Sequence, residues 1–173
     1  MSQAGQHIAA GVNSAKSLKM TVEIALYQPD MAPNAATIGR MCACFGVALT
    51  IIEPAGFAFT DSNFKRAGMD YLEKLNLHRA ASWSEFRRNA GARRLVLLTT
   101  KASLAYTDFV FSETDTLVLG RESAGVPDEV HASIAHRIRI PMRAETRSLN
   151  IAMSAALALG EALRQTQHYK TLA

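Results

Sequence analysis

Short apolar runs recur along the chain and alternate with segments of helical character. The runs at 22–27 (VEIALY), 48–52 (ALTII), 95–99 (LVLLT) and 116–119 (TLVL) are too short for helices and rich in large aliphatic or β-branched residues, and a shorter run follows at 138–140. Such runs are typical of strands buried on both faces. Because helical segments separate them, the sequence predicts an α/β protein with a mainly parallel sheet and helices on both faces.

Sequence signals for helix ends place helices between and after these strands. Asn34 is expected to cap a helix that Gly46 ends, and Ser82 with Glu85 forms a capping-box pattern that opens another. A last helix is expected from about 148 to 167, where apolar residues recur at helical spacing. Its apolar face can pack on its own domain or on a second subunit.

The chain is expected to hold one folded domain, at 20–173, because no repeat or linker divides it and its 173 residues suffice for one core. Within it, the sequence predicts a short helix at 61–68 and an extended stretch at 71–77. The segment 1–19 has no acidic residue and no strand pattern, which predicts a disordered extension. An organelle-targeting peptide is the alternative, although this segment also lacks Arg.

Charge and cysteine content indicate the kind of partner and the compartment. The formal net charge is +4 and 13 of the 19 basic residues are Arg, whose planar fork suits phosphate, so a polyanionic partner competes with a merely basic surface. Cys42 and Cys44 lie two residues apart on an expected helix, where they do not face each other. No disulfide or metal site is expected, and a reducing cytoplasm is the natural setting. No apolar run approaches the roughly 18 residues that span a membrane.

Three loops at expected strand ends carry unusual residues. They are 29–40 (PDMAPNAATIGR), 117–127 (LVLGRESAGVP) and 138–150 (IRIPMRAETRSLN). Ligands of parallel sheets bind at the carboxyl ends of strands, where these loops lie. Taken singly, each loop has an ordinary explanation: a helix start, a pair of glycine turns, and a serine cap with a satisfied asparagine.

In this order and spacing the three loops resemble the motifs of the SPOUT (α/β-knot) superfamily of RNA 2'-O-ribose methyltransferases. The segments 51–57 (IIEPAGF) and 66–71 (RAGMDY) are similar to those of the enzymes that methylate the tRNA wobble nucleotide, C34 or U34. The resemblance extends from 20 to about 169, and the extension at 1–19 departs from it. It implies a C-terminal trefoil knot, a feature that general topology rules do not predict.

The resemblance also implies the cofactor, the substrate and the assembly. It implies transfer of a methyl group from S-adenosylmethionine to a ribose 2'-hydroxyl in the tRNA anticodon stem-loop, by a cytoplasmic homodimer that needs no metal. Gly120 is expected to let the backbone approach the cofactor, and backbone groups of Ile140 and Met142 to pair with the adenine edge. The cofactor-binding residues implied are Leu98, Thr99, Gly120, Glu122, Ile140, Met142, Ser148 and Leu149.

The catalytic residues implied are Arg40, Ser148 and Asn150. In relatives the first-motif arginine is assigned to activating the 2'-hydroxyl. A guanidinium is a poor base at neutral pH, so we expect Arg40 to grip a phosphate and to stabilise the developing alkoxide. The proton acceptor stays open: Glu122 is one candidate, and its alternative role is to order the loops by accepting backbone N–H bonds.

Four arginines are candidates for contacts with the RNA backbone, against the alternatives of a solvated charge or an intersubunit ion pair. They are Arg66, Arg121, Arg143 and Arg147. The histidines His78, His131 and His136 fall in no motif, and surface or capping roles are expected for them.

Three other functions are weighed against wobble methylation. They are 2'-O-methylation of another tRNA position or of rRNA, a catalytically silent RNA-binding protein of the same fold, and a doubly wound oxidoreductase. The last requires a phosphate-binding glycine loop after the first strand, and QPDMAPN at 28–34 has none. Arg40, Ser148 and Asn150 are all present, which speaks against a silent protein.

Overall fold

The computed structural model describes residues 20–58 and 69–172. The predictions of a disordered extension at 1–19, of a helix at 61–68 and of an RNA contact at Arg66 lie outside these residues. In the described part of the chain, no helix is both long and apolar enough to cross a membrane.

The described residues form one six-stranded sheet in which every neighbouring pair of strands is parallel, in the order β3-β2-β1-β5-β4-β6. In the central strand, Ile24 pairs with Leu49 on one side and with Leu117 on the other. The predicted parallel sheet is confirmed. The strands are β1 (Glu23–Tyr27), β2 (Leu49–Ile52), β3 (Leu77–Ala80), β4 (Arg94–Leu98), β5 (Asp115–Leu119) and β6 (His136–Ile138).

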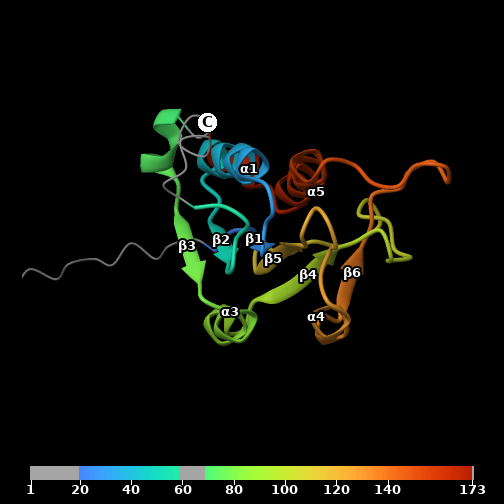
Figure 1. Ribbon diagram of the computed structural model, residues 1–173. Coiled ribbons are helices and arrows are strands. Elements are labelled where there is room, and N and C mark those ends of the chain that lie inside the picture. The colour runs from blue at the N-terminus through green and yellow to red at the C-terminus, as the bar shows by residue number, and fades with distance from the viewer. Residues whose placement is uncertain (1–19, 59–68, 173) are drawn as a thin grey trace, which may run out of the picture.

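Helices cover both faces of the sheet, as predicted (Figure 1). The helices α1 and α5 pack on one face, and α3 and α4 pack on the other. Successive residues of β1 point to opposite sides: Ile24 and Leu26 pack under α1 and α5, whereas Ala25 and Tyr27 pack against α3 and α4. The helices are α1 (Ala32–Phe45), α3 (Trp83–Ala90), α4 (Asp128–Ser133) and α5 (Ile151–Gln165), with 3-10 helices η1 (Met69–Lys74) and η2 (His168–Thr171).

Two expected helix starts are wrong. The N-cap of α1 is Met31, and the helix begins at Ala32 before Asn34, because Pro33 fits the first turn and extends it backwards. The last helix begins at Ile151 rather than near 148, because the Asn150 side chain accepts hydrogen bonds from the backbone N–H groups of residues 152 and 153.

Two further expectations need correction, and one helix was missed. The stretch 71–77 is mostly the 3-10 helix η1, and β3 begins only at Leu77. The last strand lies two residues earlier than 138–140, at His136–Ile138. The helix α4 was not predicted. The Ser82–Glu85 cap of α3 is confirmed, since the Glu85 N–H donates to the Ser82 hydroxyl.

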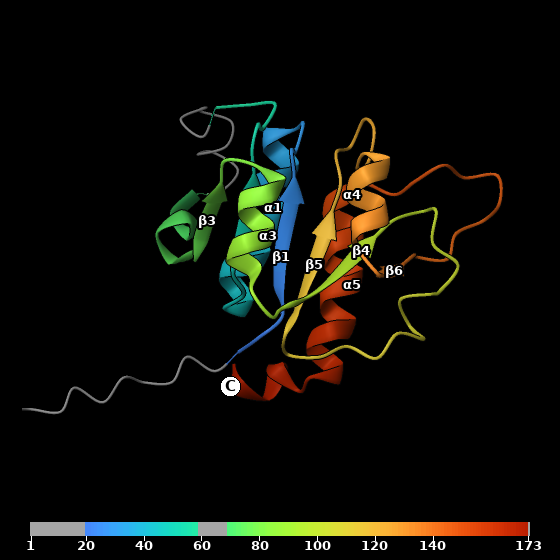
Figure 2. The same cartoon turned by 90° about the horizontal axis from the view of Figure 1, so that it is seen from below.

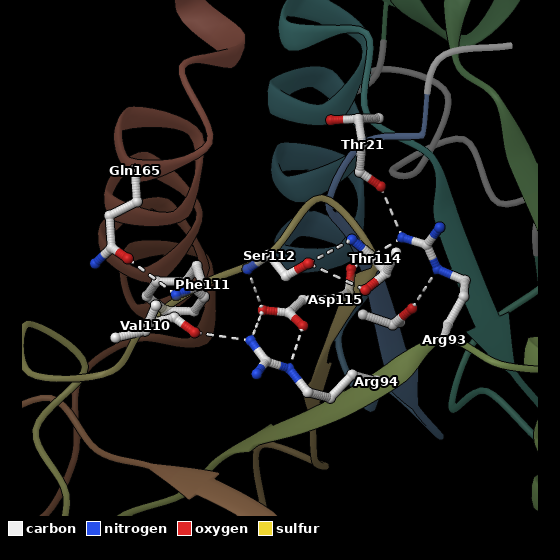
Figure 3. Close-up of polar contacts among 10 residues, drawn as sticks. Thr21, Arg93, Arg94, Val110, Phe111, Ser112, Thr114, Asp115 and Gln165 are labelled. Carbon is white, nitrogen blue, oxygen red and sulfur yellow. Dashed lines mark hydrogen bonds and ion pairs between the residues drawn. The ribbon is translucent and has the colours of Figure 1, made fainter.

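A cluster of polar contacts fixes the amino ends of the central strands (Figure 3). The carboxylate of Asp115 is fully buried at the start of β5 and accepts two hydrogen bonds from Arg94, at 2.6 and 2.8 Å. These bonds raise the pKa of Arg94. The end of α5 joins the cluster through Gln165, which accepts from the N–H of Phe111 at 2.9 Å. The strands all end at the opposite edge of the sheet, where loops follow them (Figure 2).

Candidate functional site

A cavity of about 500 Å³ lies at the carboxyl edge of the sheet. Its walls come from the loops after β4 and β5, from the segment between β6 and α5, and from the start of α1. Its volume is that of a small-molecule site. The structure brings to it all eight residues predicted to bind the cofactor, namely Leu98, Thr99, Gly120, Glu122, Ile140, Met142, Ser148 and Leu149.

Hydrogen bonds between three loops build one wall of this cavity. The Glu122 carboxylate accepts from the backbone N–H of Asp30 at 2.8 Å and from Nδ2 of Asn34 at 3.2 Å. The Asn34 Oδ1 atom in turn accepts from Nδ2 of Asn150 at 3.0 Å, and Oδ1 of Asn150 caps α5. A carboxylate only accepts hydrogen bonds and a backbone N–H only donates them. Because such groups stand at the two ends of this row of hydrogen bonds, they determine which way the side-chain amides of Asn34 and Asn150 face.

Asp30 fastens the same loops from the other side. Its carboxylate accepts from the Ser123 hydroxyl at 2.6 Å, from the Ser123 N–H at 3.0 Å and from the Arg121 guanidinium at 3.3 Å. The bonds from Ser123, followed by the weaker influence of Arg121, lower the pKa of Asp30. Arg121, a predicted RNA contact, therefore has a partner within the protein.

Gly120 has a structural reason of its own. A Cβ atom there would lie 2.5 Å from the carbonyl carbon of Gly125, because residues 121–125 fold back over it. Arg121 and Gly125 close this turn with two backbone hydrogen bonds, at 2.9 and 2.8 Å. Gly120 therefore permits a close approach of another part of the protein's own backbone. From the sequence, only a close approach of the backbone to the cofactor was predicted.

Asn34 and His131 are among the cavity-lining residues that were not predicted as site residues. Asn34 was interpreted as a helix cap, and its place in the first motif was the signal for its role. His131 was set aside as an isolated histidine, yet its side chain also lines the cavity, with Nδ1 3.4 Å from the Arg137 guanidinium. No sequence signal pointed to His131, because its helix was not predicted.

Three of the predicted arginines, Arg40, Arg143 and Arg147, lie outside this cavity. Arg40 is an exposed residue of α1, and its guanidinium carbon lies 4.7 Å from the centroid of the Tyr71 ring. Arg143 and Arg147 are exposed on the segment between β6 and α5, and Arg143 lies 3.9 Å from Glu145. Ser148 and Asn150, the other predicted catalytic residues, line the cavity itself.

A second hollow adjoins the first on the other side of the segment 140–149. It measures about 630 Å³, and Ile140, Met142, Ser148 and Leu149 line both hollows. Its other walls combine apolar residues, Tyr106, Pro141 and Leu157, with the polar residues Thr107, Arg143 and Thr146.

Comparisons with known proteins bear on both the fold and the site. The model of the SpoU rRNA Methylase family matches residues 21–160. A tRNA (cytidine(34)-2'-O)-methyltransferase of Ancylobacter novellus is 54% identical over 149 residues, which are 85% of this chain and 94% of that protein.

Solved structures give the same picture. One described as "Structural insights into the 2-OH methylation of C/U34 on tRNA" superposes with a TM-score of 0.81 at 33% identity, over 84% of this chain and 96% of that one. An AdoMet-bound rRNA methyltransferase from Sinorhizobium meliloti has a TM-score of 0.76 at 25% identity, over 83% of this chain and 56% of that one.

Proposed function

This chain belongs to the SpoU rRNA methylase family, and from that premise we propose that it transfers a methyl group from S-adenosylmethionine to the ribose 2'-hydroxyl of the tRNA wobble nucleotide, C34 or U34. The observation that carries the proposal is the 54% identity to a cytidine-34 methyltransferase over 85% of the chain. The cavity at the carboxyl edge supports it, because residues from three motifs meet there.

The cavity residues fit S-adenosylmethionine. Leu98, Ile140 and Leu149 offer aliphatic walls for the adenine, and the loop 120–126 offers backbone groups to its polar atoms. When bound, the cofactor supplies an electrophilic methyl group. The protein must then hold the ribose hydroxyl in line with that group, and positioning of this kind contributes about 7–11 kcal/mol.

The contacts in the cavity separate the roles of its polar residues. Glu122 accepts two hydrogen bonds from neighbouring loops, which favours loop ordering over proton acceptance. Asn150 caps α5 and holds Asn34, so it acts by positioning the loops. Ser148 lies at the cavity wall and is our candidate for contact with the ribose.

Arg40 is assigned to the RNA phosphate and to the developing alkoxide. Because it lies outside the cavity of its own chain, we assign it to RNA that is shared between two subunits. Arg143 and Arg147, exposed beside the cavity, are assigned to the RNA backbone.

A homodimer is part of the proposal. On and just before α5, Leu149, Met153 and Leu157 are spaced four residues apart and are 42%, 61% and 41% exposed. They form a stripe, the 149–157 stripe, beside the second hollow. Apolar side chains exposed in a row are typical of an interface, and a second copy of the chain would cover them.

A trefoil knot is also proposed. β6 lies at the sheet edge beside β4, whereas the following α5 returns to pack against α1. On this path Arg139 exchanges backbone hydrogen bonds of 2.9 Å with Leu104 and Tyr106, in the long loop between β4 and β5. The 139–150 segment therefore runs against the loop through which the knot requires it to pass.

The test is methylation of purified tRNA with a labelled methyl donor, followed by nucleoside mass spectrometry. Label is expected in 2'-O-methylcytidine or 2'-O-methyluridine at position 34, and a tRNA with a 2'-deoxyribose at that position should accept none. The free thiols Cys42 and Cys44 fit the cytoplasm, where tRNA is available.

Methylation of rRNA is the second candidate, favoured by the similarity to an rRNA methyltransferase. A parallel reaction with rRNA separates the two. Label in rRNA together with an unlabelled position 34 would replace the wobble assignment.

A further inference from the structure

The guanidinium of Arg40 contacts the face of an aromatic ring. Its carbon lies 4.7 Å from the centroid of Tyr71, a residue of η1 that packs beside α1. Tyr71 is the last residue of the RAGMDY segment, in which the sequence suggested a functional role only for Arg66.

Other arginines of this chain use their N–H groups within the protein. Arg93 donates to Thr116, Thr21 and Asp115, and Arg94 donates to Asp115 and Val110. These arginines are structural, because their donors already have acceptors.

Arg40 differs from them. In the ranges 20–58 and 69–172, no protein oxygen accepts a hydrogen bond from its guanidinium, which lies over the Tyr71 ring. Stacking on an aromatic face fixes the plane of a guanidinium but uses none of its five N–H donors, which lie in that plane. Arg40 is thus held against a ring while no acceptor in the described residues takes up its N–H donors, and bidentate binding of an anion requires such available donors.

We propose that Tyr71 is a positioning residue that holds the Arg40 guanidinium plane so that its in-plane N–H groups bind a phosphodiester of the RNA substrate. The inference rests on the proposed function and deepens it. It gives the end of the RAGMDY segment a physical role: the ring restricts the rotamers of a long side chain before RNA arrives. The conformational entropy of the Arg40 side chain is then lost during folding rather than during RNA binding.

The test is a double-mutant cycle on the purified protein. Tyr71→Leu removes the ring and Tyr71→Phe keeps it, and each is made in the wild type and in Arg40→Ala. With saturating S-adenosylmethionine, Tyr71→Leu should lower kcat/KM for tRNA by about three- to thirtyfold, the range expected from a cation–π contact and from side-chain ordering. Tyr71→Phe should stay within about threefold. Affinity for S-adenosylhomocysteine should not change.

The Arg40→Ala background distinguishes a positioning role of Tyr71 from a merely structural one. There, Tyr71→Leu should cause no further loss of rate per folded molecule, and the salt dependence of tRNA binding should match that of Arg40→Ala alone. Tyr169→Leu is the matched control, because Tyr169 packs on Phe45 and contacts no cation in the described residues. It should methylate tRNA at the wild-type rate.

The outcomes separate the two proposals. Equal losses from Tyr71→Leu in both backgrounds, or none in either, overturn the role of Tyr71 and leave the proposed function standing. A wild-type protein that does not methylate tRNA defeats the proposed function. The role of Tyr71 is then decided by tRNA binding alone, and an unchanged affinity and salt slope in Tyr71→Leu would reject it.

Discussion

The hydrogen bonds that connect Glu122, Asn34 and Asn150 can form with only one assignment of donors and acceptors. Backbone N–H groups stand at both ends, at Asp30 and at Ala152, and both can only donate. The charged carboxylate accepts on both sides, so the two amides between the ends each donate in one direction and accept in the other. A glutamine in place of Glu122 leaves two donors facing each other somewhere along this row of hydrogen bonds.

Glu122→Gln therefore tests the network at a single atom. Loss of one hydrogen bond from this part-buried network costs about 0.5–1.5 kcal/mol, and in a chain of this size each kcal/mol lowers the Tm by about 2–4 °C. We expect a drop of about 1–6 °C by scanning calorimetry. Glu129→Gln, an exposed change on α4, is the control and should leave the Tm nearly unchanged. Equal Tm values for both variants would show that the network contributes nothing.

Arg40→Lys tests the assignment of Arg40 to the reaction, because lysine keeps the charge but loses the bidentate fork. The expected loss of single-turnover rate is about two to three orders of magnitude, the scale found when one oxyanion donor is removed. Affinity for S-adenosylhomocysteine should stay near that of the wild type. A rate within about threefold of the wild type would remove Arg40 from the mechanism.

At the residue scale, the eight residues predicted to bind the cofactor line one cavity, whereas Arg40 lies outside it. The sequence did not predict how the residues of the cavity wall bond to one another. Asn34 was interpreted as a cap because a polar residue beside a proline is typical of a helix start. Its actual partner, Glu122, lies 88 residues away, and a local pattern holds no information about such a contact.

At the element scale, the turn over Gly120 decides the shape of the cavity wall. Gly120→Ala would place a methyl group 2.5 Å from the Gly125 carbonyl carbon, so the backbone of the 120–126 loop must move. We expect a loss of about 1–3 kcal/mol in unfolding free energy and weaker binding of S-adenosylhomocysteine, measured by calorimetry.

Gly160→Ala in α5 is the matched control for that variant. The added methyl group would lie 3.5 Å from the Tyr169 hydroxyl, an ordinary contact. Alanine is also the better helix former, so stability should hold or rise by up to about 1 kcal/mol. If Gly120→Ala behaves like Gly160→Ala, the turn does not depend on glycine.

Elements with a strong periodic signal were predicted well, and short ones were not. β1 and β5 each lie within about one residue of the expected run. By contrast, α4 has six residues and η1 is a 3-10 helix, so neither offers enough turns for a repeating apolar pattern. Their positions depend on packing against the sheet.

At the scale of the whole molecule, the 149–157 stripe makes a prediction about assembly. Met153→Lys should place a charge in the proposed interface and convert a dimer to an 18.8 kDa monomer in light scattering. Val110→Lys is the control, because Val110 is 78% exposed outside the stripe, and that variant should remain dimeric. A monomeric wild type that methylates tRNA would remove the dimer from the proposed mechanism.

The sequence predicted the fold class of the whole molecule but not the order of its strands. Apolar runs such as that of β1 show that a strand is buried, yet the pairing of β1 with β5 joins segments about 90 residues apart. The knot was expected from the resemblance alone, because no local pattern signals one. The dimer was expected from the resemblance together with the apolar face of the last helix.

The one-way hydrogen bonds between the motifs also have a consequence for genetics. If Glu122→Gln reverses the Asn34 amide, a carboxylate at position 150 would accept both from Asn34 and from the helix N–H groups, and aspartate is a favourable N-cap. Asn150→Asp should therefore suppress the stability defect of Glu122→Gln, although no hydrogen bond joins residues 122 and 150 in the described structure. A non-additive effect of these two substitutions would show that the Asn34 amide, which bonds to both residues, donates in one direction and accepts in the other.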